Sequence, residues 1–152
     1  MYLSASEIER MEGVHKSHYL NPAAKRLNKS LGDALGLKNI GVHLISVDPG
    51  HQSTEYHVHR FEEECIYVLS GRGIAVLGEK LQPVGPGDFI ACPTNGIAHE
   101  MINDGDEPLV CLVMGQRLAH DVTDYPRLGK RLYRNAGEWN LVDLADIEQV
   151  KR

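Results

Sequence analysis

Residues 56–71 decide the fold, and they read YHVHRFEEECIYVLSG. Side chains alternate between the two faces of a β-strand, so His57 and His59 project from the same face, roughly 7 Å apart. Two imidazoles at that spacing can converge on one metal ion with bonds of about 2.0–2.1 Å. Because a lone His-x-His pair is more often structural, further ligands are needed before the pattern indicates a metal site.

Two more residues complete a candidate ligand set. Glu64 follows His59 by five positions, an odd step, so a bend across residues 60–63 is needed for Glu64 to begin the next strand facing inward. His99 lies between apolar residues in another predicted strand, where its buried nitrogens need partners. The sequence therefore predicts a divalent metal on His57, His59, Glu64 and His99, against the alternative of a structural polar cluster.

The region from Ile40 to Met114 has a β-rich pattern. Apolar runs are broken by Gly, Pro, Asn and Asp, and Gly78-Glu79 fits a two-residue hairpin turn. Many short strands at near-regular spacing indicate an all-β sandwich, jelly roll or barrel. The expected strands cover residues 40–47, 54–59, 64–70, 72–77, 80–84, 87–92, 97–103 and 108–115.

The flanking regions read differently. Residues 1–39 are expected to form an N-terminal extension packed on a barrel core of residues 40–116. Ser6-Glu7-Ile8-Glu9 matches a capping box, and Asn21-Pro22 fits the start of another short helix. Residues 117–152 form a polar C-terminal segment that is expected to end in a short helix, because apolar residues recur at threes there. Those apolar residues are Leu141, Leu144, Ile147 and Val150.

Composition limits the classes of protein and partner. A chain of 152 residues with 42% hydrophobic residues fits one globular domain. The formal charge of −5 argues against a nucleic-acid partner, and we interpret Lys25-Arg26 with Lys29 as a solvated face. No apolar run approaches the ~20 residues of a membrane-spanning helix. The start lacks the features of a secretion signal, and three dispersed cysteines make no disulfide framework, so we expect a cytoplasmic protein.

The spacing of the motifs resembles the paired signature motifs of the cupin superfamily over about residues 41–115. Compared with the usual spacing of these motifs, this sequence has one extra residue between Gly50 and His57 and another between Pro93 and Gly96. The matching residues are His57, His59, Glu64 and Gly71 in the first motif, and Gly87, Pro93, Gly96, His99 and Asn103 in the second.

More loosely, residues 31–37 and 121–126 are similar to flanking segments of a group of small bacterial cupins. Some members of that group carry the provisional name sugar-phosphate isomerase. The resemblance implies an all-β double-stranded β-helix, or jelly-roll cupin barrel, with one metal ion inside.

The predicted ligands define the chemistry only in part. Three nitrogens and one oxygen suit Zn, Fe, Mn, Ni, Co or Cu rather than the all-oxygen shells of Ca or Mg. An open metal position would support isomerase-like or dioxygenase-like chemistry on a small polar metabolite. A non-catalytic ligand-binding or sensing cupin is the alternative. The sequence shows neither a catalytic base nor a phosphate-binding loop.

The remaining expectations concern other polar residues, assembly and pH. Glu62 and Glu63 are expected to coat the bend, and the other histidines to lie at the surface or in satisfied packing. Strand 108–115 is apolar on both faces, so the N-terminal extension or a second subunit must cover it, and we predict a homodimer. Because ligating histidines must be neutral, metal should be lost as pH falls through about 6 to 5.

Overall fold

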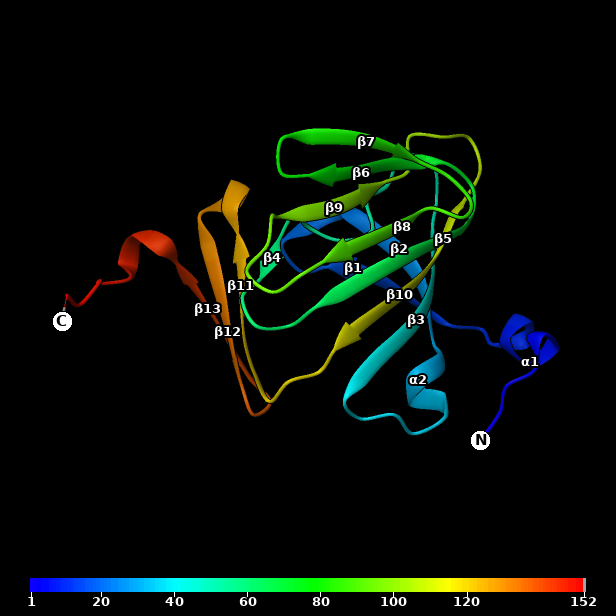
Figure 1. Cartoon of the computed structure of the whole chain (residues 1–152), viewed down its shortest axis with the longest axis horizontal. Helices are drawn as coiled ribbons and strands as arrows, with labels where there is room; N and C mark the ends of the chain where they lie inside the picture. Colours follow the sequence, from blue (N-terminus) through cyan, green and yellow to red (C-terminus); the bar gives the residue numbers. More distant parts are fainter. Residues whose placement is uncertain (152) are drawn as a thin grey trace.

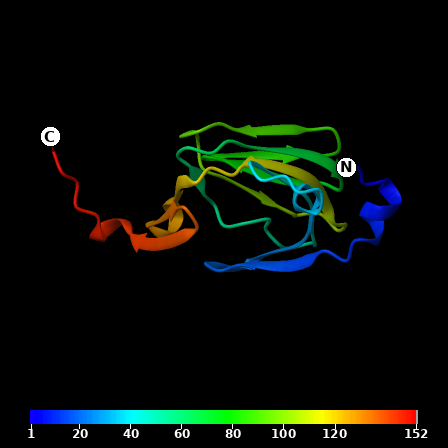
Figure 2. The ribbon, with the colours of Figure 1, turned by 90° about the horizontal axis from the view of Figure 1, so that it is seen from below.

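The computed structural model describes residues 1–151, in which two antiparallel sheets form the body of the molecule (Figure 1). Figure 2 shows the smaller sheet facing β1 and β2 as a second layer, as in a jelly roll. The larger sheet has the order β1 (Val14–His18), β2 (Asn21–Ser30), β3 (Ile40–Val47), β10 (Leu109–Gln116), β5 (Glu64–Ser70) and β8 (Phe89–Cys92). The smaller sheet has the order β7 (Lys80–Val84), β6 (Gly73–Leu77) and β9 (His99–Ile102). The predicted all-β jelly-roll barrel is confirmed.

The core lies between these layers and follows strand alternation. On β5, Ile66 and Val68 are buried, whereas Tyr67 and Leu69 between and after them are exposed. This is the inward and outward assignment that an inward-facing Glu64 requires. The largest fully buried apolar side chains come from both sheets and include Val47, Val68, Met101 and Leu109.

Glycine is required where the chain turns tightly. Gly71 has a φ of +79°, and a Cβ atom there would collide with the Pro108 carbonyl oxygen. Gly78, with a φ of +61°, opens the predicted two-residue turn, and the hairpin register pairs Leu77 with Lys80. The chain reversals on either side of β6 therefore follow from glycine positions visible in the sequence.

The predicted strand 54–59 is largely wrong, because only β4 (Val58–His59) forms there. The Ser53 amide donates to the Met101 carbonyl oxygen, and His57 and His99 form an isolated antiparallel bridge. Advancing four residues, from Ser53 to His57, thus corresponds to advancing only two residues on β9, from Met101 to His99. The two additional residues bulge out of the ladder.

The N-terminal region contains strands as well as a short helix. Helix α1 (Ala5–Arg10) is capped by Ser4 with Glu7, two residues earlier than the predicted box. The helix expected at Asn21-Pro22 is wrong, since β2 starts there and pairs with β3. Helix α2 (Leu31–Ala34) then leads to β3.

The expected short C-terminal helix is present only as a single 3-10 turn. Strands β11 (His120–Tyr125), β12 (Lys130–Asn135) and β13 (Glu138–Asp143) form an antiparallel meander that continues β4, and two 3-10 turns, η1 (Pro126–Leu128) and η2 (Leu144–Asp146), follow β11 and β13. Ala136 and Gly137 both have positive φ and close the β12–β13 hairpin, so Leu141 lies in a strand. The apolar residues spaced three positions apart therefore lie in a strand and a turn rather than in one helix.

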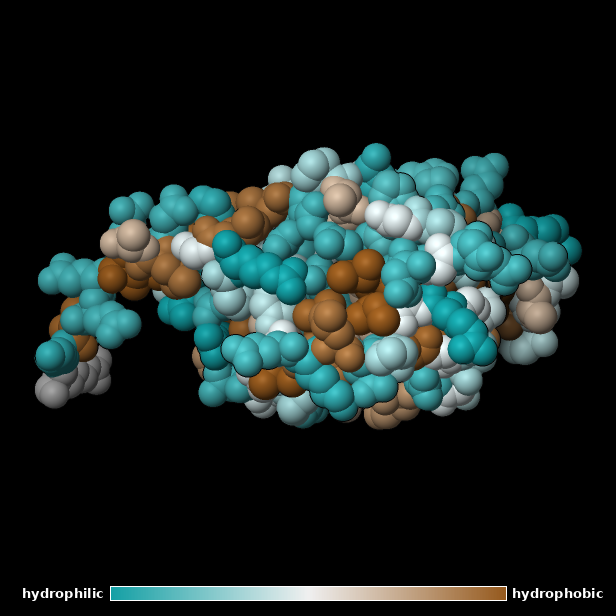
Figure 3. Space-filling model, turned by 90° about the horizontal axis from the view of Figure 1, so that it is seen from above, coloured by the Kyte–Doolittle hydropathy of each residue, from teal (hydrophilic) through white to brown (hydrophobic). Residues whose placement is uncertain are grey.

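The molecular surface carries exposed hydrophobic side chains. Figure 3 shows them gathered in a patch over the barrel and along the C-terminal arm. Tyr67, Leu69 and Phe89 are exposed on β5 and β8. The homodimer stays a prediction, and a monomer mass that does not change with concentration in light scattering would exclude it. None of the helices within residues 1–151 has the length and apolar character to cross a membrane.

Candidate metal centre

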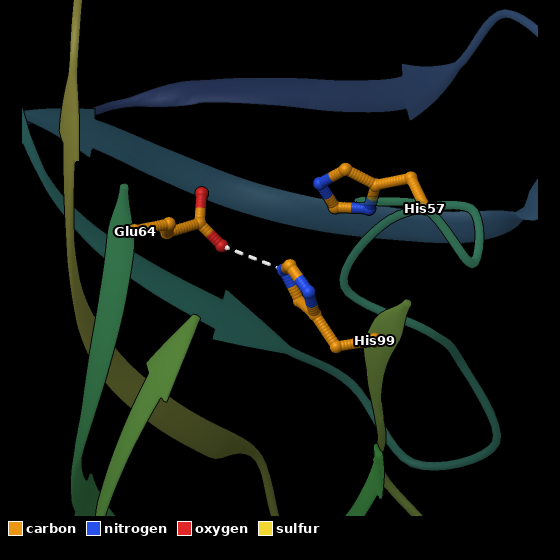
Figure 4. A group of neighbouring side chains, drawn as sticks. All are labelled: His57, Glu64 and His99. Carbon is orange, nitrogen blue, oxygen red and sulfur yellow. Dashed lines mark ion pairs between the residues drawn. The ribbon is translucent and has the colours of Figure 1, made fainter. Parts of the chain in front are cut away.

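Three of the four predicted ligands converge inside the barrel (Figure 4). His57 precedes β4, Glu64 is the first residue of β5, and His99 is the first residue of β9. One potential ligand atom from each lies within 4.8 Å of the others. The predicted bend across residues 60–63 is present and turns Glu64 inward. These three residues are called the metal cluster below.

His57 is held with a free electron pair. Its Nδ1 lies 2.8 Å from the Glu55 carbonyl oxygen. A carbonyl oxygen can only accept a hydrogen bond, so Nδ1 carries the hydrogen and donates it. Burial, reinforced by the neighbouring His99 and His59, lowers the pKa of His57 to about 3. The ring is therefore neutral at physiological pH, with its electron pair on Nε2, the form that a metal ligand requires.

His99 has unmet hydrogen-bonding capacity. Both of its ring nitrogens are buried, and neither has a hydrogen-bond partner among residues 1–151. Its Nε2 lies 3.4 Å from Glu64 Oε1. Burial alone favours neutral His99, but the nearby Cys92 thiol and the Glu64 carboxylate raise its pKa. Burial likewise acts to raise the pKa of Glu64, and the adjacent histidines outweigh it and lower that pKa.

These features fit a metal ion. Buried polar atoms nearly always have hydrogen-bond partners, so two nitrogens on one buried ring without a hydrogen bond need an explanation. A donor set of two imidazoles and one carboxylate is that of a transition ion such as zinc, iron or manganese. The metal cluster would hold such an ion, although its geometry does not select among the metals.

His59 belongs to a second, adjacent group. Its ring centroid is 4.9 Å from that of His57, but its Nδ1 is 2.6 Å from Asp121 Oδ2. His59, Glu62 and Asp121 bring their ligand atoms within 4.8 Å of one another. We call these three residues the polar cluster. The role of His59 as a fourth ligand stays a prediction.

The polar cluster is already filled with hydrogen bonds. Asp121 Oδ1 accepts the backbone amides of Phe61 and Glu62 at 3.1 and 3.3 Å. Burial acts to raise the pKa of Asp121, but the His59 contact and these amides lower it to about 2. Glu62 accepts the Leu118 amide at 2.6 Å and forms an ion pair with Arg134. A carboxylate surrounded by donors has little capacity left for a metal.

Asp121 nevertheless bears on the metal cluster. A carboxylate on Nδ1 fixes the hydrogen of neutral His59 on that nitrogen and leaves the electron pair on Nε2. Carboxylate–histidine pairs of this kind orient metal ligands in many proteins. No local pattern predicts this contact, because Asp121 lies 62 positions from His59 on β11, in the polar C-terminal segment.

A cavity of about 370 Å³ opens next to both clusters. It is at the small end of ligand-binding pockets, which suits a small metabolite. Its wall includes polar residues that the sequence placed at the surface, among them His18, Arg26 and Glu62. Glu62 is buried, contrary to the expectation that it coats the bend, whereas Glu63 is exposed as expected.

Comparison with known proteins identifies the class. Residues 43–115 match the family model described as "Cupin domain". A crystal structure from Acidithiobacillus ferrooxidans, provisionally named a sugar phosphate isomerase, is 58% identical, with a TM-score of 0.98, over 99% of this chain and 97% of that one. The protein therefore belongs to the cupin family. None of the functionally curated proteins compared with the chain matches it.

More distant structures share the fold to different extents. A sugar phosphate isomerase of the cupin superfamily from Silicibacter pomeroyi is 28% identical, with a TM-score of 0.81, over 99% of this chain and 97% of that one. The TT1209 protein from Thermus thermophilus is 22% identical, with a TM-score of 0.53, over 60% of this chain and 82% of that one, and supports the barrel fold alone. The N-terminal and C-terminal strands are therefore shared with the first two structures.

Proposed function

We propose that this protein is a metal-dependent isomerase of a small phosphorylated sugar. The observation that carries the proposal is the metal cluster, in which neither ring nitrogen of the buried His99 has a hydrogen bond among residues 1–151, and Nε2 faces the Glu64 carboxylate at 3.4 Å. The cavity beside it, of about 370 Å³, suits a small ligand. Two full-length relatives bear the name sugar phosphate isomerase, which supports this substrate class.

A bound divalent metal supplies polarisation of a carbonyl or hydroxyl oxygen, which eases proton movement between neighbouring carbons. The residues of this chain have separate tasks. Neutral His57 offers Nε2, Glu64 provides negative charge, and His99 completes the metal cluster. We propose His59 as the fourth ligand, held in its required tautomer by Asp121. Aldose–ketose interconversion is the reaction that this arrangement supports.

The test is turnover by the purified protein reconstituted separately with zinc, manganese, iron, cobalt, nickel and copper. Aldose and ketose phosphates of different lengths are supplied, and interconversion is followed by NMR. We expect conversion of at least one sugar phosphate, lost in His99→Ala and retained in His15→Ala, whose histidine is exposed. Stoichiometric metal without any turnover would contradict an isomerase and favour the ligand-binding alternative. Oxygen consumption by the iron form would favour dioxygenase chemistry.

A further inference from the structure

Arg26 is an inward-facing cation on β2. Ala24 and Asn28 on either side of it are buried, whereas the intervening Lys25 is exposed. Because side chains alternate along a strand, Arg26 points to the same side as Ala24 and Asn28, and it lines the cavity beside the metal cluster. The expectation of one solvated face at Lys25-Arg26 is therefore wrong for Arg26, because the two side chains lie on opposite faces of the strand.

The charge of Arg26 has no acidic partner within residues 1–151. Its Nη1 donates to the Ser53 carbonyl oxygen, but no carboxylate forms a salt bridge with it. The other partly buried arginines are paired with Asp or Glu, namely Arg60, Arg117, Arg131 and Arg134. Removing a guanidinium from water without a counter-charge is costly, so an unpaired one on a cavity wall is suited to an anionic ligand.

Arg26 also lies within electrostatic reach of the metal cluster. Burial lowers the pKa of Arg26, and the negative charge of Glu64 opposes that effect. Both side chains line the same cavity. A single small molecule can therefore place one end at the metal cluster and an anionic end at Arg26.

His18 adds a second donor on this wall. Its Nδ1 accepts the Leu20 amide at 3.2 Å, so the hydrogen of the neutral ring is on Nε2. Its ring stacks on Tyr19 with centroids 4.6 Å apart, which restricts its orientation. His18 lines the cavity with Arg26, whose charge helps to keep the ring neutral after burial has lowered its pKa.

We propose that Arg26, assisted by His18, binds the phosphate group of the substrate while the metal cluster engages its carbonyl end. This assignment rests on the proposed function and deepens it, because it names the residue that would select phosphorylated over unphosphorylated sugars. A guanidinium can donate two parallel hydrogen bonds to phosphate oxygens, which an ammonium cannot reproduce.

The experiment measures inorganic phosphate binding by calorimetry and 31P NMR on the metal-loaded protein, independently of turnover. The variants are Arg26→Met, Arg26→Lys and, as a matched control, Lys25→Met on the outer face. We expect Arg26→Met to weaken phosphate binding about tenfold or more, the size of a lost charge-assisted contact. Arg26→Lys should recover part of the affinity, and Lys25→Met should equal wild type. His99→Ala should still bind phosphate.

Other outcomes would overturn the assignment. These are no phosphate binding by wild type, equal binding by wild type and Arg26→Met, or binding lost only in His99→Ala, which would place phosphate at the metal. Tighter binding of acetate than of phosphate would mean that Arg26 recognises a carboxylate group of the substrate instead of a phosphate group. If Arg26→Met does not fold, a shift of the Arg26 side-chain NMR signals in wild type on adding phosphate serves instead, and its absence counts against the assignment. If the isomerase assay fails while phosphate still binds in a way that depends on Arg26, the proposed reaction is rejected and the phosphate assignment stands.

Discussion

The metal cluster and the polar cluster lie side by side, and each combines histidine with carboxylate at similar distances. They differ in what surrounds them. Asp121 and Glu62 in the polar cluster accept backbone amides and face His59 and Arg134. His99 in the metal cluster has no hydrogen bond to either ring nitrogen among residues 1–151, and its Nε2 faces the Glu64 carboxylate. Proximity of ligating residues alone therefore does not distinguish the two clusters, whereas the lack of hydrogen bonds to His99 favours the metal cluster as the candidate site.

The largest expected effect comes from the metal cluster itself. Glu64→Gln removes its only negative charge, so metal affinity should fall about hundredfold or more, in line with losing a primary ligand, since supporting residues alone cost 10–100-fold. Glu63→Gln, on the adjacent exposed residue, is the control and should keep wild-type affinity. Competition with a chromogenic chelator measures both. Equal affinities in the two variants would remove Glu64 from the site.

Asp121→Asn tests how the polar cluster supports its neighbour. The amide cannot hold the Nδ1 hydrogen of His59 as a carboxylate does, so metal affinity should fall about 10–100-fold. The 15N chemical shifts of His59 should show the other tautomer gaining population. Asp106→Asn, at an exposed loop position, should change neither quantity. Unchanged His59 shifts in Asp121→Asn would show that the contact does not set the tautomer.

The pH dependence of metal binding has a definite sign. The raised pKa of His99 means that the metal-free site carries a proton at neutral pH, and a metal must displace it. Affinity should rise with pH, by about tenfold per unit for one displaced proton. Calorimetry in buffers of different ionisation enthalpy should report release of about one proton at pH 7. Release of none would mean that His99 is neutral or does not bind the metal.

The same shifts determine the stability of the metal-free protein. Its raised pKa makes the His99 contribution complete below the ordinary histidine pKa of about 6.5, and that contribution is lost as pH rises through the folded-state value. The lowered pKa of Glu64 makes its contribution complete above about 4.5, and this is lost on acidification. Both contributions are complete between about pH 4.5 and about pH 6.5. Thermal unfolding across pH should show that Glu64→Gln loses the most stability in that range. An identical loss at all pH values would argue against an ion pair.

Glu62→Gln should have the smallest effect on metal. It weakens a buried contact with the Leu118 amide and Arg134, so the free energy of unfolding should fall by about 1–3 kcal/mol. Metal content should stay at the wild-type level. Chemical denaturation and elemental analysis of one preparation provide the two values. Metal lost from a stably folded Glu62→Gln would unite the two clusters into one site.

Sequence patterns predicted the barrel because its determinants are local. β3, β5 and β7 begin and end where apolar runs and turn glycines place them, and alternation alone identified the inward side of β5. The spacing within two short motifs predicts His57, Glu64 and His99 as candidate ligands, and the structure brings their side chains together. Such features need no knowledge of distant contacts.

Features that depend on distant contacts were not predicted. The meander β11–β13 forms by pairing with β4, which brings Asp121 to His59 across 62 positions. The neighbouring lysines predict a solvated Arg26, because the sequence does not reveal which face of β2 the barrel covers. The expected strand 54–59 is shorter in the structure because the chain bulges before His57. Its pairing depends on His99 of β9, which lies 42 positions later in the sequence.

The most direct test of the metal site is elemental analysis of protein purified without an affinity tag. Wild type is compared with the His57→Ala/His99→Ala double variant, and circular dichroism confirms that both are folded. Near one transition metal per chain in wild type and almost none in the folded double variant is the predicted result. Wild type that holds no metal even after reconstitution, or equal metal in both proteins, would contradict a metal centre on His57, Glu64 and His99.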